Sequence, residues 1–273
     1  MAPSPRASRR VLLASAAAAA LVAGCAADKE SAMTGVETIT YGDDPVQLGE
    51  LTRPQGQSRG VVVVVHGGFW KAAYGLDLIR PLAEDLADRG WTTWNIEYRR
   101  VAAGGGFPAT LDDVHAAIER LADLDVDTAR VVTLGHSAGG HLAAWAAARG
   151  RFDRWPTTVQ VTEVVSLAGV LDLVAAVGAD LGDGAALALM GGPPGPDYDL
   201  ADPARQLPLD VPLWCVHGRD DTLVPPSQSL DYVDRARTAG ARAEAVLVDG
   251  DHFVVADTGS EAWRRTVGIL EGL

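Results

Sequence analysis

One pentapeptide constrains the fold more than any other stretch of this sequence. It reads Gly-His-Ser-Ala-Gly over residues 135–139, after the apolar run Val131–Leu134 and before the alanine-rich stretch Leu142–Ala148. This pattern predicts a strand, a sharp turn that carries the serine, and a helix. Such a turn strains the serine backbone, and Gly135 and Gly139 would let the strand and the helix approach closely enough to hold it. The alternative is an ordinary strand-to-helix turn that happens to contain serine.

Apolar runs alternate with helical patterns along the rest of the chain. Five consecutive valines, Val61–Val65, predict a strand that is buried on both faces, as inside a parallel sheet. Further strands are expected over Glu37–Tyr41, Val46–Leu51, Trp91–Ile96, Val159–Ala168, Val211–Val216 and Ala243–Val248. Helices are expected over Ile79–Leu86, from Pro108 to Leu121, after Ser137, and over Leu171–Val177, Ala185–Met190, Ser227–Ala239 and from Ser260 onward. The alternation predicts an α/β fold with a mostly parallel, doubly wound sheet, preceded by a short antiparallel hairpin.

The composition fits one large domain. The 273 residues are 48% hydrophobic, which is enough for a substantial core, and no segment resembles a linker. The longest gap between expected strands, Gly169–Asp210, predicts a short lid over the site. At its start, Asp172 could cap a helix or contact a substrate. A formal charge of −13 offers no basic face for phosphates, so nucleic acid is not expected as a partner.

Ser137 needs partners before it can act as a nucleophile. A serine hydroxyl reacts poorly at neutral pH, so it requires a base, and the base requires an acid that orients it. In such sheets the acid and then the base follow the serine, on loops at the carboxyl ends of later strands. His252 follows the last expected strand and is predicted to be the base. Asp221 is preferred over Asp220 as the acid, because it begins the Asp-x-x-Val-Pro pattern typical of such acid loops.

The remaining histidines and the second cysteine have simpler interpretations. Four histidines are expected to be structural or exposed: His115, His136, His141 and His217. Cys215 lies inside an apolar run and is expected to fill core space. The other cysteine, Cys25, is expected to carry lipid, so no intramolecular disulfide is predicted.

A glycine-rich turn, His66–Trp70, follows the valine strand. Attack on a carbonyl creates an oxyanion, and a turn at this strand end can direct backbone N–H groups toward it. The donors are expected from Gly68 or Phe69, together with the N–H of Ala138. The neighbouring aromatic side chains indicate an apolar pocket. Trp70 is therefore a candidate substrate contact, with burial in the core as the alternative.

Together these motifs resemble the α/β-hydrolase family from about residue 36 to the C-terminus. The turn His-Gly-Gly-Phe-Trp is similar to the HGGxW motif of kynurenine formamidases and related carboxylesterases. Tyr98-Arg99, Phe107–Ala109 and the pair Asp112-Asp113 are similar to a segment of hormone-sensitive-lipase-like esterases. Arg100–Gly106 departs from the sequence that those lipase-like members usually carry there.

The resemblance implies an acyl hydrolase with a Ser-Asp-His triad. It assigns Ser137 as nucleophile, Asp221 as acid and His252 as base. The leading hypothesis is a serine hydrolase that cleaves small-molecule carboxylic esters through an acyl-enzyme. Amide or peptide hydrolysis, as in arylformamidases or serine peptidases of this fold, is the alternative, and a non-catalytic surface binding protein is a third. No cofactor is expected, since the glycines do not form GxGxxG after an early strand and the histidines form no HExxH or other compact metal pattern.

The first residues predict export. A basic segment precedes the mostly alanine run Val11–Ala23, which is typical of a signal peptide and is too short and weakly apolar for a stable membrane span. Residues 1–24 are interpreted as this peptide. The sequence Val-Ala-Gly-Cys at its end resembles the bacterial lipobox, in which Cys25 carries lipid; a plain secretory peptide with a chance cysteine is the alternative. Residues 25–35 would be a tether and residues 36–273 the catalytic domain, anchored at the extracytoplasmic side of the cell membrane after export by the Sec or twin-arginine route.

Overall fold

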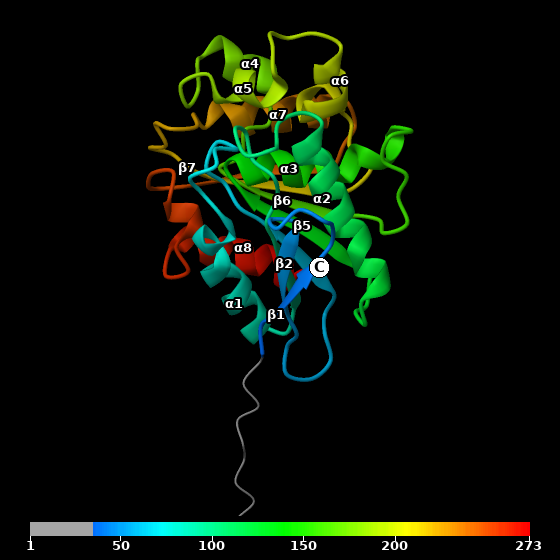
Figure 1. The fold of residues 1–273 in the computed structure, drawn as a ribbon. Helices are drawn as coiled ribbons and strands as arrows, with labels where there is room; N and C mark the ends of the chain where they lie inside the picture. The colour runs from blue at the N-terminus through cyan, green and yellow to red at the C-terminus, as the bar shows by residue number, and fades with distance from the viewer. Residues whose placement is uncertain (1–34) are drawn as a thin grey trace, which may run out of the picture. The chain divides into compact units, whose positions relative to one another are not determined.

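The computed structural model describes residues 35–273. The predicted signal peptide, Cys25 and all but the last residue of the tether lie outside this part and stay predictions. The described residues form one eight-stranded sheet with the order β1-β2-β4-β3-β5-β6-β7-β8 (Figure 1). Its strands are β1 Glu37–Thr40, β2 Leu48–Thr52, β3 Val61–Val65, β4 Thr92–Ile96, β5 Val131–His136, β6 Glu163–Leu167, β7 Leu213–Gly218 and β8 Ala243–Val248.

The strand pairing confirms the expected sheet. β1 and β2 form an antiparallel hairpin, and β2 also pairs antiparallel with β4. All other neighbours, from β4 through β3 and β5 to β8, are parallel. The α-helices of residues 35–273 are α1 Arg80–Asp88, α2 Ala109–Glu119, α3 Ala138–Ala148, α4 Leu173–Gly178, α5 Ala185–Met190, α6 Asp197–Ala201, α7 Ser227–Thr238 and α8 Glu261–Glu271. Because parallel strands end at one edge, the loops after β3, β5, β7 and β8 meet there.

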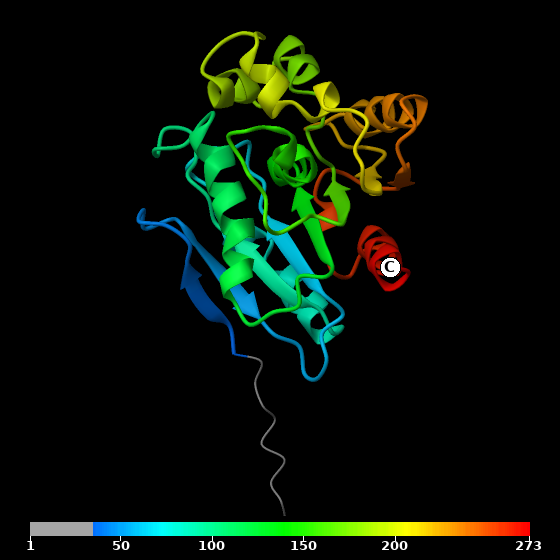
Figure 2. The ribbon, with the colours of Figure 1, turned by 90° about the vertical axis from the view of Figure 1, so that its right-hand side faces the viewer.

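The valine strand explains how the two faces of the sheet are covered. Val61, Val63 and Val65 pack into a core with α2, α3 and α7, whereas Val62 and Val64 pack into a second core with α1 and α8. Side chains alternate between faces along a strand, so five valines in a row bury both faces. Figure 2 shows the red helix α8 and the green helix α2 on opposite sides of the sheet.

Several strand bounds differ by a residue or two from the sequence-based expectation, and two elements differ more. β6 begins at Glu163 and not at Val159, and its pairing with β5 starts at the same residue, opposite Val132. Val159 is nevertheless buried, so its apolar character serves the core outside the strand. Helix α6 was not expected. It is one short turn-like helix that follows a glycine- and proline-rich loop and lacks a clear helical pattern.

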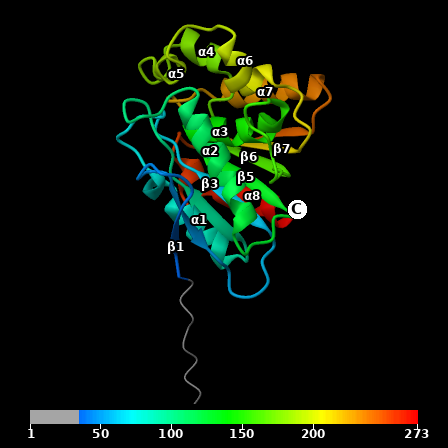
Figure 3. The same ribbon diagram turned by 45° about the vertical axis from the view of Figure 1, so that its right-hand side comes forward.

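Helices α4, α5 and α6 occupy the gap between β6 and β7 where a lid was expected. Figures 1 and 3 show them grouped beyond the edge at which the parallel strands end. The Asp172 carboxylate accepts a hydrogen bond from the Ala175 N–H at 2.8 Å, so it caps α4. Among residues 35–273, no helix combines the length and the apolar character that a membrane span requires.

Candidate active site

Ser137 lies at the sharp turn that the pentapeptide predicted. β5 ends at His136, α3 begins at Ala138, and Ser137 between them has φ 57° and ψ −118°. A non-glycine residue rarely adopts a positive φ, and such strain persists only where the surroundings enforce it. Here the Ser137 N–H donates to the Leu167 carbonyl at 2.8 Å, and its carbonyl accepts from the Gly140 N–H at 2.9 Å. The serine is therefore held between β6 and the first turn of α3.

The glycines around the serine are steric requirements. A Cβ atom at Gly135 would lie 2.1 Å from the Gly139 carbonyl oxygen, and one at Gly139 would lie 2.0 Å from the Val65 carbonyl oxygen. Both distances are far below van der Waals contact, and the atoms they meet belong to the backbone. The strand, the helix and β3 can meet around Ser137 only because these two side chains are absent.

The structure brings Asp221 and His252 together and leaves Asp220 aside. Asp221 Oδ2 lies 2.6 Å from His252 Nδ1, and the two residues are 5% and 4% exposed. Asp220 is exposed, and its Oδ2 accepts from the Gly250 N–H at 3.4 Å. The ring of His252 lies 4.7 Å from that of His136, which directly precedes Ser137. Within residues 35–273 no hydrogen bond joins His252 to Ser137, a contact that is often long in a free enzyme.

Asp221 is held as an ionised carboxylate. Its Oδ1 accepts from the backbone N–H groups of Leu223 and Val224 at 2.9 and 2.8 Å. Its Oδ2 faces His217 Nε2 at 3.0 Å in addition to His252. Burial alone would raise the pKa of the Asp221 carboxyl, but hydrogen bonds from the two histidines and from the Val224 N–H lower it well below the ordinary value. The carboxylate therefore stays charged at neutral pH.

The glycine-rich turn lies directly against the serine. A Cβ atom at Gly67 would be 3.0 Å from Ser137 Cβ and 2.7 Å from the His136 carbonyl oxygen. Beyond it, the backbone is left-handed at Gly68, with φ 103°, and at Phe69, with φ 52°. The non-glycine residue in this conformation stores strain on the order of 1–3 kcal/mol. A strained turn at this place is consistent with backbone N–H groups being directed at the oxygen of a carbonyl that Ser137 attacks.

Trp70 belongs to the core and not to a substrate surface. Its side chain is 1% exposed and packs edge-on against His141, with ring centroids 5.3 Å apart. The expected substrate contact is therefore not supported, and the alternative of core burial describes this residue. Trp70 also has a positive φ of 55°, and its carbonyl accepts from the Val101 N–H at 2.9 Å. This hydrogen bond connects the turn to the segment that contains Val101.

Glu97, which the sequence analysis did not single out, supports the same turn. His66 Nε2 lies 2.8 Å from Glu97 Oε1, and the His66 carbonyl accepts from the Tyr98 hydroxyl at 2.9 Å. The rings of His66 and Tyr98 stack with centroids 4.2 Å apart. In the structure, Val65 of β3 pairs with Ile96 of β4, and this register places His66 and Glu97, the next residue of each strand, side by side. This network fixes the start of the turn.

The lid also contacts this turn. Lys71 Nζ donates to the Gly182 carbonyl at 2.9 Å, and a Cβ atom at Gly182 would lie 2.5 Å from the Phe69 ring. Gly182 is left-handed, with φ 63°, as are Asp180 and Asp183 beside it. The conformation of this lid segment therefore sets where the Phe69 side chain lies.

His136, His141 and Cys215 behave as structural residues. His136 and His141 are buried and bind backbone carbonyls of His252 and Ala201. Burial and the neighbouring His252 lower the pKa of His136 to about 3, and burial lowers that of His141 to about 4, so both are neutral. Cys215 is buried and unpaired, and burial raises its pKa to about 12.

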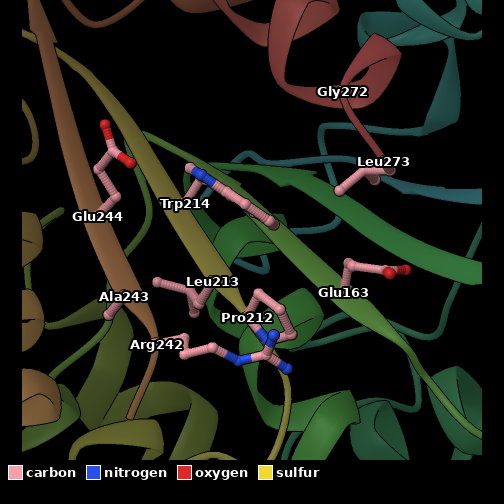
Figure 4. A pocket seen from close by; sticks show the side chains of 9 residues that line it. All are labelled: Glu163, Pro212, Leu213, Trp214, Arg242, Ala243, Glu244, Gly272 and Leu273. Carbon is pink, nitrogen blue, oxygen red and sulfur yellow. The ribbon is translucent and has the colours of Figure 1, made fainter.

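The hollow drawn in Figure 4 is remote from Ser137. It measures about 450 Å³ and lies at the amino ends of β6, β7 and β8, the edge opposite the catalytic loops. Its lining includes Glu163, Trp214, Arg242 and Glu244. Among the described residues, no cluster of three or more His, Cys, Asp or Glu side chains could hold a metal ion.

Comparison with known proteins places this arrangement in a family. The family model described as BD-FAE matches residues 50–235. Isoprenylcysteine alpha-carbonyl methylesterase ICME of Arabidopsis thaliana is 27% identical over 236 aligned residues, which cover 78% of this chain and 55% of that protein. Esterase LipQ of Mycobacterium tuberculosis is 28% identical over 204 aligned residues, covering 68% of this chain and 48% of that protein. The chain spans about half the length of these curated relatives.

Solved structures agree on the fold. The esterase Est2 of Thermogutta terrifontis superposes with a TM-score of 0.71 and 23% identity, over 88% of this chain and 92% of that one. Esterase B of Lactobacillus rhamnosis, solved with a tributyrin phosphonate, gives a TM-score of 0.75 at 21% identity, over 87% and 84% of the two chains. The family match extends over more than half of the 273 residues. The chain therefore belongs to the BD-FAE family, and its fold is the α/β-hydrolase fold.

Proposed function

We propose that this chain is a serine hydrolase that cleaves small-molecule carboxylic esters through an acyl-enzyme. The observation that carries the proposal is the buried contact of 2.6 Å between Asp221 and His252, beside the strained turn at Ser137. The named relatives are esterases, which supports ester cleavage over amide cleavage. Nothing described within residues 35–273 specifically favours a peptide substrate or a purely binding role.

The contact between Asp221 and His252 defines the state of the base. An ionised carboxylate accepts, so the proton on the His252 ring lies on Nδ1 and Nε2 keeps a free lone pair. Nε2 can then take the proton of Ser137 Oγ as Oγ forms a bond to the ester carbonyl carbon. Asp221 stabilises the imidazolium that results and does not itself take the proton.

The remaining steps return every group to its starting state. The tetrahedral intermediate collapses by breaking the bond to the alkoxy oxygen, which receives the proton from His252 Nε2 and leaves as alcohol. Water then attacks the Ser137 acyl ester and gives its proton to the same nitrogen. Breaking the bond between the acyl carbon and Ser137 Oγ releases the acid, and Oγ recovers its proton.

The oxyanion is assigned to backbone donors. The Ala138 N–H lies at the first position of α3, where helical N–H groups have no partner within the helix. Gly68 and Phe69 supply the second side of the hole from the strained turn. Because this turn is fixed before a substrate arrives, no reorganisation is required during reaction.

The test is hydrolysis of p-nitrophenyl esters of increasing acyl length by the wild-type protein and by Ser137→Ala. We expect turnover by the wild type and a loss of roughly 10⁴-fold or more in the variant, with an unchanged thermal unfolding midpoint. A matching panel of p-nitroanilides separates ester from amide cleavage. Equal rates for the purified wild type and Ser137→Ala would overturn the proposal.

We also propose that the protein is an exported lipoprotein. The support is the signal-peptide pattern of residues 1–24 and the lipobox-like sequence that ends at Cys25. The test is fractionation of cells that express the full chain or Cys25→Ser. We expect the wild type in the membrane fraction and the variant outside it; membrane association of both proteins in equal amounts would contradict a lipid on Cys25.

A further inference from the structure

We propose that His217 is a positioning residue of the reaction, which holds the Asp221 carboxylate in the orientation that His252 requires. This inference rests on the proposed function, because it assigns a role within the same site. The sequence predicted a structural or exposed histidine at this place. The observation is that one carboxylate oxygen, Asp221 Oδ2, faces two imidazole rings at once: His252 Nδ1 at 2.6 Å and His217 Nε2 at 3.0 Å.

The surroundings of His217 determine which ring nitrogen donates. Nε2 faces two acceptors, Asp221 Oδ2 and the Val224 carbonyl oxygen, which lies 2.9 Å away. A nitrogen between two acceptors must carry the proton, so Nε2 is a donor. Nδ1 lies 2.7 Å from the Ser229 hydroxyl, which can donate to it or accept from it. The ring is therefore fixed from both ends.

This arrangement links three elements to the acid. His217 lies in β7, Ser229 in α7, and Asp221 and Val224 in the loop between them. The side chains of His217 and Asp221 are both 0% exposed, so water cannot replace a lost donor. Without the His217 proton, Oδ2 would have only His252 as a donor, while Oδ1 would stay bound to the Leu223 and Val224 N–H groups. His217 thus supplies the second donor that fixes the position of Oδ2 against His252.

A purely structural histidine would act differently. A space-filling role would depend on ring volume, whereas the proposed role depends on a proton donated at the position of Nε2. The side-chain amide of glutamine can place a donor at about the same reach, and leucine fills similar space without one. The two substitutions therefore separate the two roles.

The pH dependence adds a second distinction. The titratable groups facing Asp221 are His217 from β7 and His252 from the loop after β8, with His136 of β5 behind His252. A carboxylate with one donor fewer attracts the His252 proton more strongly. Losing the His217 donor should therefore move the acidic limb of the kcat/KM profile to higher pH, because the base stays protonated further up the pH range.

The experiment compares full-length wild type, His217→Leu and His217→Gln on the p-nitrophenyl ester that the wild type cleaves best. For His217→Leu we expect kcat to fall roughly 10- to 100-fold, KM to stay near the wild-type value, and the acidic limb to move upward. His217→Gln should recover most of kcat and the wild-type limb. Equal losses in the two variants with an unmoved limb, or wild-type kcat in His217→Leu, would overturn the inference.

A second variant covers the case in which His217→Leu does not fold. Ser229→Ala removes the hydrogen bond at Nδ1, so the His217 ring is held less firmly and its donation to Asp221 weakens without being lost. We therefore expect a smaller fall in kcat and a smaller upward movement of the acidic limb than in His217→Leu. A wild-type kcat and an unmoved acidic limb in Ser229→Ala would then overturn the role. An inactive wild type that also resists labelling by a fluorophosphonate would instead defeat the proposed function itself.

Discussion

Asp221 and Asp202 are both almost completely buried, yet their pKa values move in opposite directions. Asp221 lies in the acid loop after β7, and Asp202 lies in the lid, between α6 and the turn that follows it. Burial is the largest influence on each and would raise both pKa values. The pKa of Asp221 is nevertheless well below its ordinary value, whereas that of Asp202 is raised to about 6.

The difference lies in the donors. Both carboxylates accept backbone N–H groups: Asp202 takes those of Leu173 and Ala204 at 3.1 Å. Only Asp221 faces imidazole nitrogens, and they supply the further stabilisation that keeps its charge. At Asp202, burial and the nearby Asp172 carboxylate therefore outweigh the backbone donors, and the carboxyl is easier to protonate. The comparison separates a carboxylate suited to support a base from one that ties together parts of a lid.

The largest expected effect follows from removing the charge at Asp221. Asp221→Asn should lower kcat roughly 10³- to 10⁴-fold, because an amide can force His252 into the wrong tautomer. The matched control is Asp220→Asn, since Asp220 is the exposed neighbour and faces only the Gly250 N–H. The measurement is kcat on p-nitrophenyl esters. A large loss of kcat in Asp220→Asn, together with an active Asp221→Asn, would show that Asp220 and not Asp221 is the acid.

The second effect concerns stability against pH at Asp202. A carboxyl whose pKa is raised from 3.8 to about 6 on folding binds its proton more tightly in the folded state, so its contribution to the free energy of unfolding falls as pH rises from about 4 to above 6. The fall is up to about 3 kcal/mol. Asp221 has the opposite sign: its contribution is complete above the ordinary carboxyl pKa and is lost as the pH decreases below it.

Asp202→Asn tests this sign, because the amide resembles the protonated acid. Urea unfolding of wild type and variant at pH 4.5 and pH 7.5 measures the free energy of unfolding of each. The difference between variant and wild type should shift in favour of the variant at the higher pH. A difference that does not change with pH, or that changes in favour of the wild type, would remove the contrast between the two aspartates.

The third effect tests whether the lid acts on the oxyanion turn. Gly182→Ala adds a Cβ atom 2.5 Å from the Phe69 ring at a left-handed residue, so it should displace Phe69 and lower kcat roughly 10- to 100-fold. Gly178→Ala is the control in the same lid, since a Cβ there meets no atom within 4 Å. Equal kcat values for the two variants would show that the contact between lid and turn does not matter for catalysis.

The smallest effect is expected at Asp172. Its carboxylate caps α4 through the Ala175 N–H and pairs with Arg235 at 2.8 Å. Asp172→Ala should therefore cost about 1 kcal/mol of stability and leave KM unchanged. Thermal unfolding and ester kinetics measure the two quantities. A raised KM with unaltered stability would instead make Asp172 the substrate contact that the sequence left open.

The elements that carry the site could be predicted because each has a local signal. Composition and hydrophobic period were enough to predict the pentapeptide turn, the valine strand and the strand Ala243–Val248. The structure has β8 with the bounds expected for that last strand. The partnership of His217 with Asp221 could not be predicted. It depends on how the loop after β7 turns back, and a histidine before a glycine at a strand end carries no sign of that. Burial of Trp70 was likewise open, since an aromatic residue suits a pocket and a core equally.

The most direct test of the whole account is active-site labelling with a fluorophosphonate, followed by peptide mass mapping. Only an activated serine reacts at an appreciable rate, so the adduct reports the complete arrangement of nucleophile, base and acid. We predict one adduct, located on Ser137, with slower labelling in Asp221→Asn and none in Ser137→Ala. Ester hydrolysis by a protein whose Ser137 remains unlabelled, or an adduct on another residue, would contradict the account.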